Sequence, residues 1–288
     1  MDIEIFQICY TKELLNNIPE SFSALDNSEN LRPDWREYWP IRNYLLENEL
    51  ETNKLYGFLS PKFKYKTSLS HKIIDNFIKN NYQGEDLVSF SPFWDLSSFF
   101  INSIEQGEFF QPGFYGAFEQ FSNHISCNNI LLKMPSPMER TVFSNFFLGT
   151  KSFWIKWLEI GEKLFDLCEN GNSLQNNLLL SKTPYENSNL PMKIFVQERI
   201  TDLLLILDHN IKNLAFDSFL LSSSITAFNE YKNELIICNS LKNSFFNTNK
   251  HIYFNSLVDY RIELIKKMIL DHPILYGRFK NMIDNFQI

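Results

Sequence analysis

The residues best suited to chemistry follow an apolar run, Leu55–Leu59, that ends at a Ser-Pro pair. Lysines then occupy the alternate positions Lys62, Lys64 and Lys66, with aromatic residues between them. Ammonium groups bind phosphate as point charges, and the aromatic rings could stack on a base. The pattern therefore favours a site for a phosphate-bearing ligand, although a solvent-exposed basic loop would show the same pattern.

A glutamate beside an arginine offers a second kind of chemistry. Glu198 and Arg199 stand before a strongly apolar stretch, in a helix expected over residues 194–208. A carboxylate in a cleft can act as a general base toward a hydroxyl group. A carboxylate at a helix start is also favoured by the helix dipole, which would explain Glu198 without any reaction. The sequence leaves both interpretations open.

Acidic and amide groups follow an expected strand, Asp86–Ser91. Asp95 is the acid at the end of that strand. Its oxygens suit a divalent cation such as Mg²⁺ or Mn²⁺, but it could instead cap a helix that begins at the next residue. Segment 105–108 places two carboxylates and an amide, including Gln106 and Glu108, beside a glycine that permits close backbone approach. These groups suit ligand hydroxyls, and a polar helix end is the alternative.

Short strands alternate with helices over the first 95 residues, which predicts an α/β fold with a mainly parallel sheet and helices on both faces. Asp34 is expected to cap the helix Trp35–Asn48, with Glu37 completing a capping box. The expected strands and helices of this half are Ile3–Tyr10, Ser21–Leu25, Leu55–Leu59 and Asp86–Ser91, and Trp35–Asn48 and Ser70–Asn80.

The rest of the chain is expected to be mainly helical. No repeat, Gly/Ser linker or low-complexity tail interrupts it, so a single domain over residues 1–288 is predicted. The expected elements are helices at Ser97–Glu105, Pro112–Phe121, Lys151–Cys168, Ile194–Asp208 and Leu257–Leu270, a strand at Thr141–Gly149 and a loop at Gly171–Asn189.

Composition and missing motifs exclude several classes of protein. A net charge of -7 argues against nucleic-acid binding, which needs a basic surface. The four cysteines form no CxxC pair and indicate reduced thiols in a cytoplasmic protein. No dinucleotide, P-loop, nucleophile-elbow or HExxH motif is present. No apolar run approaches the roughly 20 residues of a membrane span, so at most peripheral membrane contact is expected.

Eight segments, between residues 3 and 207, resemble a group of bacterial glycosyltransferases that occur with capsule and O-antigen gene clusters. Their order is also similar to that of small sugar-nucleotide transferases with the GT-A fold. The segments are IFQICY, ALDNS, RPDWREYWPIRNYL, LYGFLSPKF, DLVSFSPFWD, NSIEQGEFFQPG, FSNFFLGTKSFW and VQERITDLLL.

The resemblance implies a Rossmann-like GT-A-type sheet in residues 1–150 that binds a nucleotide sugar, and a mostly helical acceptor-side half in residues 151–288. It implies hexosyl or deoxyhexosyl transfer from a nucleotide-sugar donor to a cell-surface glycan or lipid-linked glycan, of capsule, O-antigen or lipopolysaccharide, at the inner face of the membrane. The implied residues are Glu198 and Asp95 for catalysis, Asp95 also for a metal ion, Gln7, Tyr10, Asp34, Arg36, Lys62, Lys64 and Ser91 for the donor, and Gln106, Glu108, Asn145 and Arg199 for the acceptor.

The chain departs from that group of enzymes in one respect. It has no paired-carboxylate DxD motif, which leaves the expected divalent cation open. The basic segment 62–66 could neutralise a diphosphate in its place. The alternative function is a non-catalytic glycan- or nucleotide-binding module of a polysaccharide assembly complex.

Overall fold

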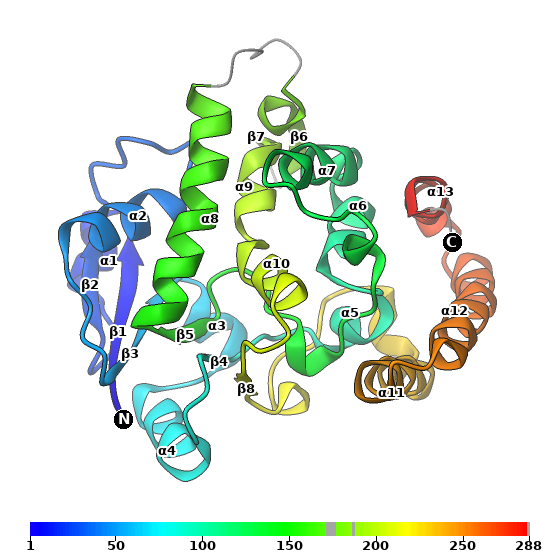
Figure 1. Cartoon of the computed structure of the whole chain (residues 1–288), viewed down its shortest axis with the longest axis horizontal. Helices are drawn as coiled ribbons and strands as arrows, with labels where there is room; N and C mark the ends of the chain where they lie inside the picture. The colour runs from blue at the N-terminus through cyan, green and yellow to red at the C-terminus, as the bar shows by residue number, and fades with distance from the viewer. Residues whose placement is uncertain (171–176, 186–187, 287–288) are drawn as a thin grey trace.

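A computed structural model describes residues 1–170, 177–185 and 188–286. Six strands form one sheet in the order β2-β1-β3-β5-β4-β8 (Figure 1). β1 pairs in parallel with β2 and β3, and β4 pairs in parallel with β8, whereas β5 runs antiparallel between β3 and β4. The strands are β1 (Asp2–Cys9), β2 (Ser23–Asp26), β3 (Lys54–Leu59), β4 (Leu87–Ser89), β5 (Phe147–Thr150) and β8 (Asn213–Ala215).

Helices flank this sheet, and a small hairpin lies beside it. Figure 1 shows α11, α12 and α13 on the side of the molecule away from β1–β3, with α5, α6 and α7 between. The expected α/β fold, a mostly parallel sheet with flanking helices, is thereby confirmed. The α-helices are α1 (Lys12–Asn16), α2 (Tyr38–Glu47), α3 (Phe63–Thr67), α4 (His71–Asn81), α5 (Trp94–Phe99), α6 (Ser103–Phe110), α7 (Phe114–His124), α8 (Lys151–Glu169), α9 (Met192–Gln197), α10 (Ile200–Leu207), α11 (Lys232–Thr248), α12 (His251–Asp271) and α13 (Tyr276–Phe286). The hairpin is β6 (Lys182–Tyr185) and β7 (Ser188–Pro191), and the 3₁₀ turns are η1 (Leu131–Lys133), η2 (Met138–Arg140), η4 (Leu178–Leu180), η5 (Ser218–Leu220), η6 (Ala227–Glu230) and η7 (Pro273–Leu275).

The two faces of the sheet bury different cores because side chains alternate along each strand. On β3, Tyr56 and Phe58 join the larger core, which also contains residues of α2 and α8. Leu55 and Leu59 face the other way and join the core that contains Ile74 of α4. A third apolar cluster joins α5 to α11 and α12. None of the described helices is long and apolar enough to cross a membrane.

The helix expected at residues 35–48 begins later than the sequence indicated. α2 starts at Tyr38, and Glu37 occupies its N-cap position without a side-chain hydrogen bond, so Asp34 caps nothing. Asp34 is instead bound to Arg32 at 2.9 Å and to Lys193 at 2.6 Å. These cations keep the pKa of Asp34 below its usual range. The prediction of Asp34 as a cap is wrong because two cations compete successfully for its carboxylate.

Two helices expected to be continuous are each interrupted. Residues 97–105 are divided between α5 and α6, and the amide of Asn102 caps α6 by accepting from the N–H of Ile104 and of Glu105. Segment 105–108 therefore lies inside a helix and is not a helix end. Residues 194–208 are likewise divided between α9 and α10, and the break falls at Glu198 and Arg199.

Other expectations need smaller corrections. The strand expected from Thr141 begins only at Phe147, and segment 62–66 is largely the short helix α3. Of the loop expected at 171–189, residues 171–176 and 186–187 lie outside the described residues, and the hairpin β6–β7 occupies part of the remainder. The sequence analysis did not anticipate α1, β8, α11 or α13.

Close packing of α8 on α2 yields the first prediction. A Cβ added at Gly161 of α8 would lie 2.6 Å from a ring carbon of the fully buried Tyr38, whereas one added at Gly277 of α13 would meet nothing within 4 Å. We expect Gly161→Ala to lower the free energy of unfolding by about 1–3 kcal/mol through overpacking. Gly277→Ala, the matched control, should leave it unchanged or raise it by up to about 1 kcal/mol. Urea denaturation measures both, and equal effects would contradict the packing.

Candidate functional site

A cavity of about 410 Å³ opens at the carboxyl ends of β1 and β3. The chain passes from β1 to β2 on one side and reaches β3 on the other, so the strand order reverses here. Ligands of open α/β sheets bind at such a switch point. We call this space the switch-point cavity; its lining is Tyr10, Leu14, Arg36, Glu37, Ser60, Pro61, Lys62, Lys66, Phe93, Gln106, Phe143, Ser144, Phe146, Tyr185, Glu198 and Arg199.

Arg199 is a buried cation whose hydrogen bonds hold one wall of the cavity together. Its guanidinium donates to the carbonyl oxygens of Ser103 (3.1 Å) and Phe195 (2.9 Å) and to Oε1 of Gln106 (2.6 Å). It also lies over the ring of Phe114, 4.8 Å from its centroid. A buried charge is tolerated only when its donors are satisfied. Arg199 therefore joins α6, α7 and α9 and has a structural role; it also lines the cavity, and its expected contact with an acceptor stays a prediction.

Glu198 projects into the cavity from the break between α9 and α10. Its carboxylate lies 3.6 Å from the guanidinium of Arg199, and 28% of the side chain is exposed. Burial, together with the nearby charge of Glu37, raises the pKa of Glu198 to about 7, against the attraction of Arg199. A carboxylate with a pKa near neutrality, facing a cavity, is suited to accept and return a proton.

Basic side chains line the switch-point cavity together with Glu198. Because α3 is helical, Lys62 and Lys66, four residues apart, fall on one face. Lys64 lies on another face, is exposed and does not line the cavity, so the alternate-position pattern misplaced it. Arg36 lines the cavity as well and lies over the ring of Tyr185, 5.5 Å from its centroid. The cavity is thus locally cationic in a chain of net charge -7 and suits an anion.

The backbone around this cavity is unusual. Arg36, Phe93 and Ser144 all line it and all have left-handed conformations, with φ of 41°, 66° and 51°. A bulky residue such as phenylalanine rarely adopts a positive φ. Such conformations cost about 1–3 kcal/mol each and concentrate at functional sites.

Some residues implied for the donor and acceptor lie elsewhere. Gln7, Ser91 and Asn145 are buried and do not line the switch-point cavity. The hydroxyl of Ser91 accepts from the backbone N–H of Phe143 at 3.2 Å, which holds the neighbouring loop. Tyr10 does line the cavity, and burial raises the pKa of its hydroxyl. Of these four residues, the structure brings only Tyr10 to Glu198.

Two implied carboxylates hold backbone in place. Asp95 is fully buried within the first turn of α5, neither capping that helix nor facing the cavity, and it accepts from the N–H and the hydroxyl of Ser224. Glu108 accepts from the N–H of Gly113 at 3.0 Å and of Tyr115 at 2.8 Å, at the start of α7. Within residues 1–170, 177–185 and 188–286, no three His, Cys, Asp or Glu side chains gather as a metal site. The residues around Asp95 therefore do not fit a protein-held cation, and we derive no step from one.

Sequence reasoning missed several residues of the cavity. Lys66 was predicted as part of the basic segment, and the structure places it in the cavity together with Lys62. Phe93, Ser144 and Tyr185 carry no local signal, since they reach the cavity through loops and the hairpin.

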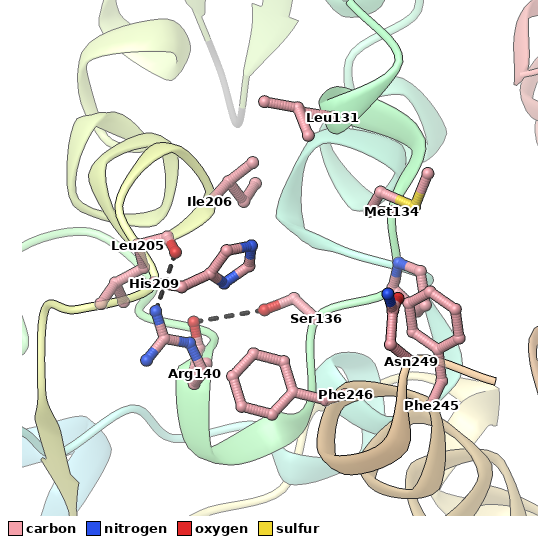
Figure 2. A pocket seen from close by; sticks show the side chains of 11 residues that line it. Leu131, Met134, Ser136, Arg140, Leu205, Ile206, His209, Phe245, Phe246 and Asn249 are labelled. Carbon is pink, nitrogen blue, oxygen red and sulfur yellow. Dashed lines mark hydrogen bonds between the residues drawn. The ribbon is translucent and has the colours of Figure 1, made fainter.

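A separate cavity of about 440 Å³ lies between α10, α11 and the segment that contains η1 and η2 (Figure 2). Its lining is mainly apolar and includes Leu131, Phe245 and Phe246. Arg140 reaches it, but its guanidinium donates to the carbonyl oxygens of Leu205 (2.8 Å) and Ile211 (3.0 Å). None of its lining residues is a carboxylate. It contains a histidine, His209, but lacks the carboxylate and the group of cations that distinguish the switch-point cavity.

Comparisons with protein-family models, curated proteins and solved structures found no match for this chain. The assignment of the site therefore depends on its geometry.

The raised pKa of Glu198 yields a prediction about stability. Between pH 4.5, the usual pKa of glutamate, and about 7, the folded state holds a proton that the unfolded state has lost. The free energy of unfolding must therefore fall as the pH rises through this range. Glu198→Gln removes this dependence, so the variant should gain stability relative to the original chain between pH 5 and pH 8.

Urea denaturation at the two pH values measures this change. Glu159→Gln, which removes a carboxylate from an exposed pair with Lys163, controls for the loss of one charge and should show a much smaller change. A stability difference for Glu198→Gln that is the same at pH 5 and pH 8 would contradict the raised pKa.

Proposed function

We propose that this protein is a glycosyltransferase that binds a nucleotide-sugar donor in the switch-point cavity. The observation that carries the proposal is the juxtaposition, at a sheet's topological switch point, of basic side chains and a carboxylate whose pKa is about 7. The motif resemblance supports a cell-surface glycan as the acceptor.

The basic side chains suit the donor's diphosphate. Lys62, Lys66 and Arg36 would contribute charge-assisted hydrogen bonds to the phosphate oxygens. When the sugar leaves, negative charge grows on the bridging oxygen, and fixed cations stabilise that charge. The rings of Tyr10 and Tyr185 line the same space and offer stacking surfaces for the base or the sugar.

Glu198 suits the acceptor side of the reaction. Its carboxylate would take the proton of the acceptor hydroxyl as that oxygen attacks the anomeric carbon. The bond from the anomeric carbon to the diphosphate breaks, and the nucleoside diphosphate leaves with the bonding electrons. A base with a pKa near the working pH is deprotonated often enough to act and still basic enough to be effective.

Lysine substitutions test the donor site. We expect the double variant Lys62→Ala, Lys66→Ala to bind nucleoside diphosphates about tenfold more weakly or worse, because two cationic contacts in the cavity are lost. Lys64→Ala removes an exposed lysine from the same helix, outside the cavity, and should bind as the original chain does. Titration calorimetry with UDP and GDP measures the affinities. If Lys64→Ala loses as much affinity for nucleoside diphosphates as the double variant does, the loss comes from the general surface charge and not from the cavity.

Glu198→Gln tests the chemistry. We expect the release of nucleoside diphosphate from a panel of nucleotide sugars to fall about 10²–10⁴-fold, with the affinity for nucleoside diphosphate unchanged. In the original chain the rate should rise with pH and level off above about 7, where Glu198 is deprotonated. A wild-type protein that binds nucleoside diphosphates and turns over no donor would instead be a binding module.

A further inference from the structure

The cavity of about 440 Å³ between α10 and α11, which we call the α10–α11 cavity, is a second candidate for ligand binding. Its volume lies within the range of small-molecule sites, roughly 300–1,000 Å³. In the described part of the chain it shares no lining residue with the switch-point cavity. A molecule bound here would therefore be a second ligand, separate from the donor.

Arg140 is the cation of the α10–α11 cavity, and its hydrogen bonds leave part of the guanidinium unused. Of the five N–H groups that a guanidinium carries, two donate to the carbonyl oxygens of Leu205 (2.8 Å) and Ile211 (3.0 Å). The other three have no acceptor among the described residues. Burial lowers the pKa of Arg140 against the attraction of Asp202 and Asp208, and neither of these carboxylates lines the cavity. The guanidinium can therefore take a further acceptor.

Other polar groups lie in the same part of the α10–α11 cavity (Figure 2). The ring of Phe246 joins them, because the guanidinium of Arg140 lies over it, 5.1 Å from its centroid, and the centroid of the His209 ring is 6.0 Å away. An imidazole can donate a hydrogen bond whether it is neutral or charged. The hydroxyl of Ser136 donates to the carbonyl oxygen of Arg140 at 3.3 Å. This part of the cavity thus offers donors and a positive charge.

Apart from Asn249, the rest of the wall is apolar. Figure 2 shows Leu131 and Met134 across the space from Arg140, and Ile206 lines the cavity from α10. A ligand in contact with these side chains would remove their apolar surface from water. The wall therefore favours a ligand that is mostly hydrocarbon.

We propose that the α10–α11 cavity binds a small apolar carboxylic acid in its ionised form. The carboxylate would accept hydrogen bonds from Arg140 and His209, and such bonds to a charged group are the stronger ones. The hydrocarbon part would contact Leu131, Met134 and Ile206. An amine would find no carboxylate among the lining residues. This site goes beyond the proposed function and does not depend on it.

Octanoate and phenylacetate are the probes, and octanol and phenylethanol are their matched neutral partners. Both acids are ionised at neutral pH. Titration calorimetry on the full chain should show each carboxylate binding at least about tenfold more tightly than its alcohol, because the alcohol loses the charge-assisted hydrogen bonds.

Two substitutions that fill the cavity from different walls test its location. Ile206→Trp and Leu131→Trp should each weaken binding of the carboxylates at least about tenfold, because the added ring takes the space of the hydrocarbon part. The second variant decides the matter if the first does not fold. Ile237→Trp is the matched control, since Ile237 is an exposed residue of α11 that lines neither cavity, and it should bind the probes as the original chain does.

His209→Ala tests the recognition of the carboxylate. We expect it to lower the affinity for octanoate about threefold or more, because one donor is lost, and to change the affinity for octanol less. His124→Ala removes an exposed histidine that lines neither cavity and should change neither affinity.

The outcomes are separate from those for the switch-point cavity. If the alcohols bind as tightly as the carboxylates, the ligand class is wrong. If the carboxylates do not bind, or bind equally well to both filling variants, the site is wrong. Loss of binding in the double variant Lys62→Ala, Lys66→Ala would place the probes in the switch-point cavity and would also overturn the proposal. None of these results changes the expected binding of nucleoside diphosphate.

Discussion

The arrangement around the candidate site depends on one buried cation. Arg199 is almost fully enclosed, and a guanidinium in that position must find acceptors within the protein. It finds them on α6 and α9, which brings these helices together and orients Gln106. The same enclosure desolvates Glu198 and moves its pKa to about 7. The hydrogen bonds of Arg199 and the proposed chemistry of Glu198 thus share one cause. The burial that obliges Arg199 to find acceptors within the protein also disfavours the ionised form of Glu198.

The sequence was informative about the sheet and less so about the helices that complete the site. β1 and β3 are apolar runs with clear ends, so their carboxyl ends and the lysine at 62 could be placed. The break between α9 and α10 could not be placed from the sequence. Glu198 and Arg199 are both good helix formers, and the apolar periodicity continues through them. At this break Arg199 makes tertiary hydrogen bonds to Ser103 and Gln106, which have no signal in the local sequence. By contrast, the break before α6 had a readable signal in Asn102, an N-cap residue followed three positions later by Glu105.

The basic segment, residues 62–66, shows how assuming the two-residue period of an extended chain misplaces side chains that belong to a helix. As an extended segment, residues 62–66 would direct all three lysines to the same side, because they occupy every second position. As α3, the segment buries Phe63 and Thr67, four residues apart, and that burial directs Lys62 and Lys66 toward the cavity and leaves Lys64 in water. The number of lysines that line the cavity therefore follows from which apolar pair is buried. Composition alone indicated a phosphate site but could not identify its members.

Backbone strain distinguishes the switch-point cavity from the cavity near α10. Asn249, which lines that separate cavity, has a positive φ, but asparagine tolerates this conformation at a helix end. Phe93 and Arg36 do not tolerate it easily, and their surroundings must offset the cost. For Phe93 the hydrogen bond from its N–H to the carbonyl oxygen of Ser222 contributes. Because Phe93 lines the switch-point cavity, its strained backbone helps to set the shape of that cavity, and a change of φ there would change the space that a ligand can occupy.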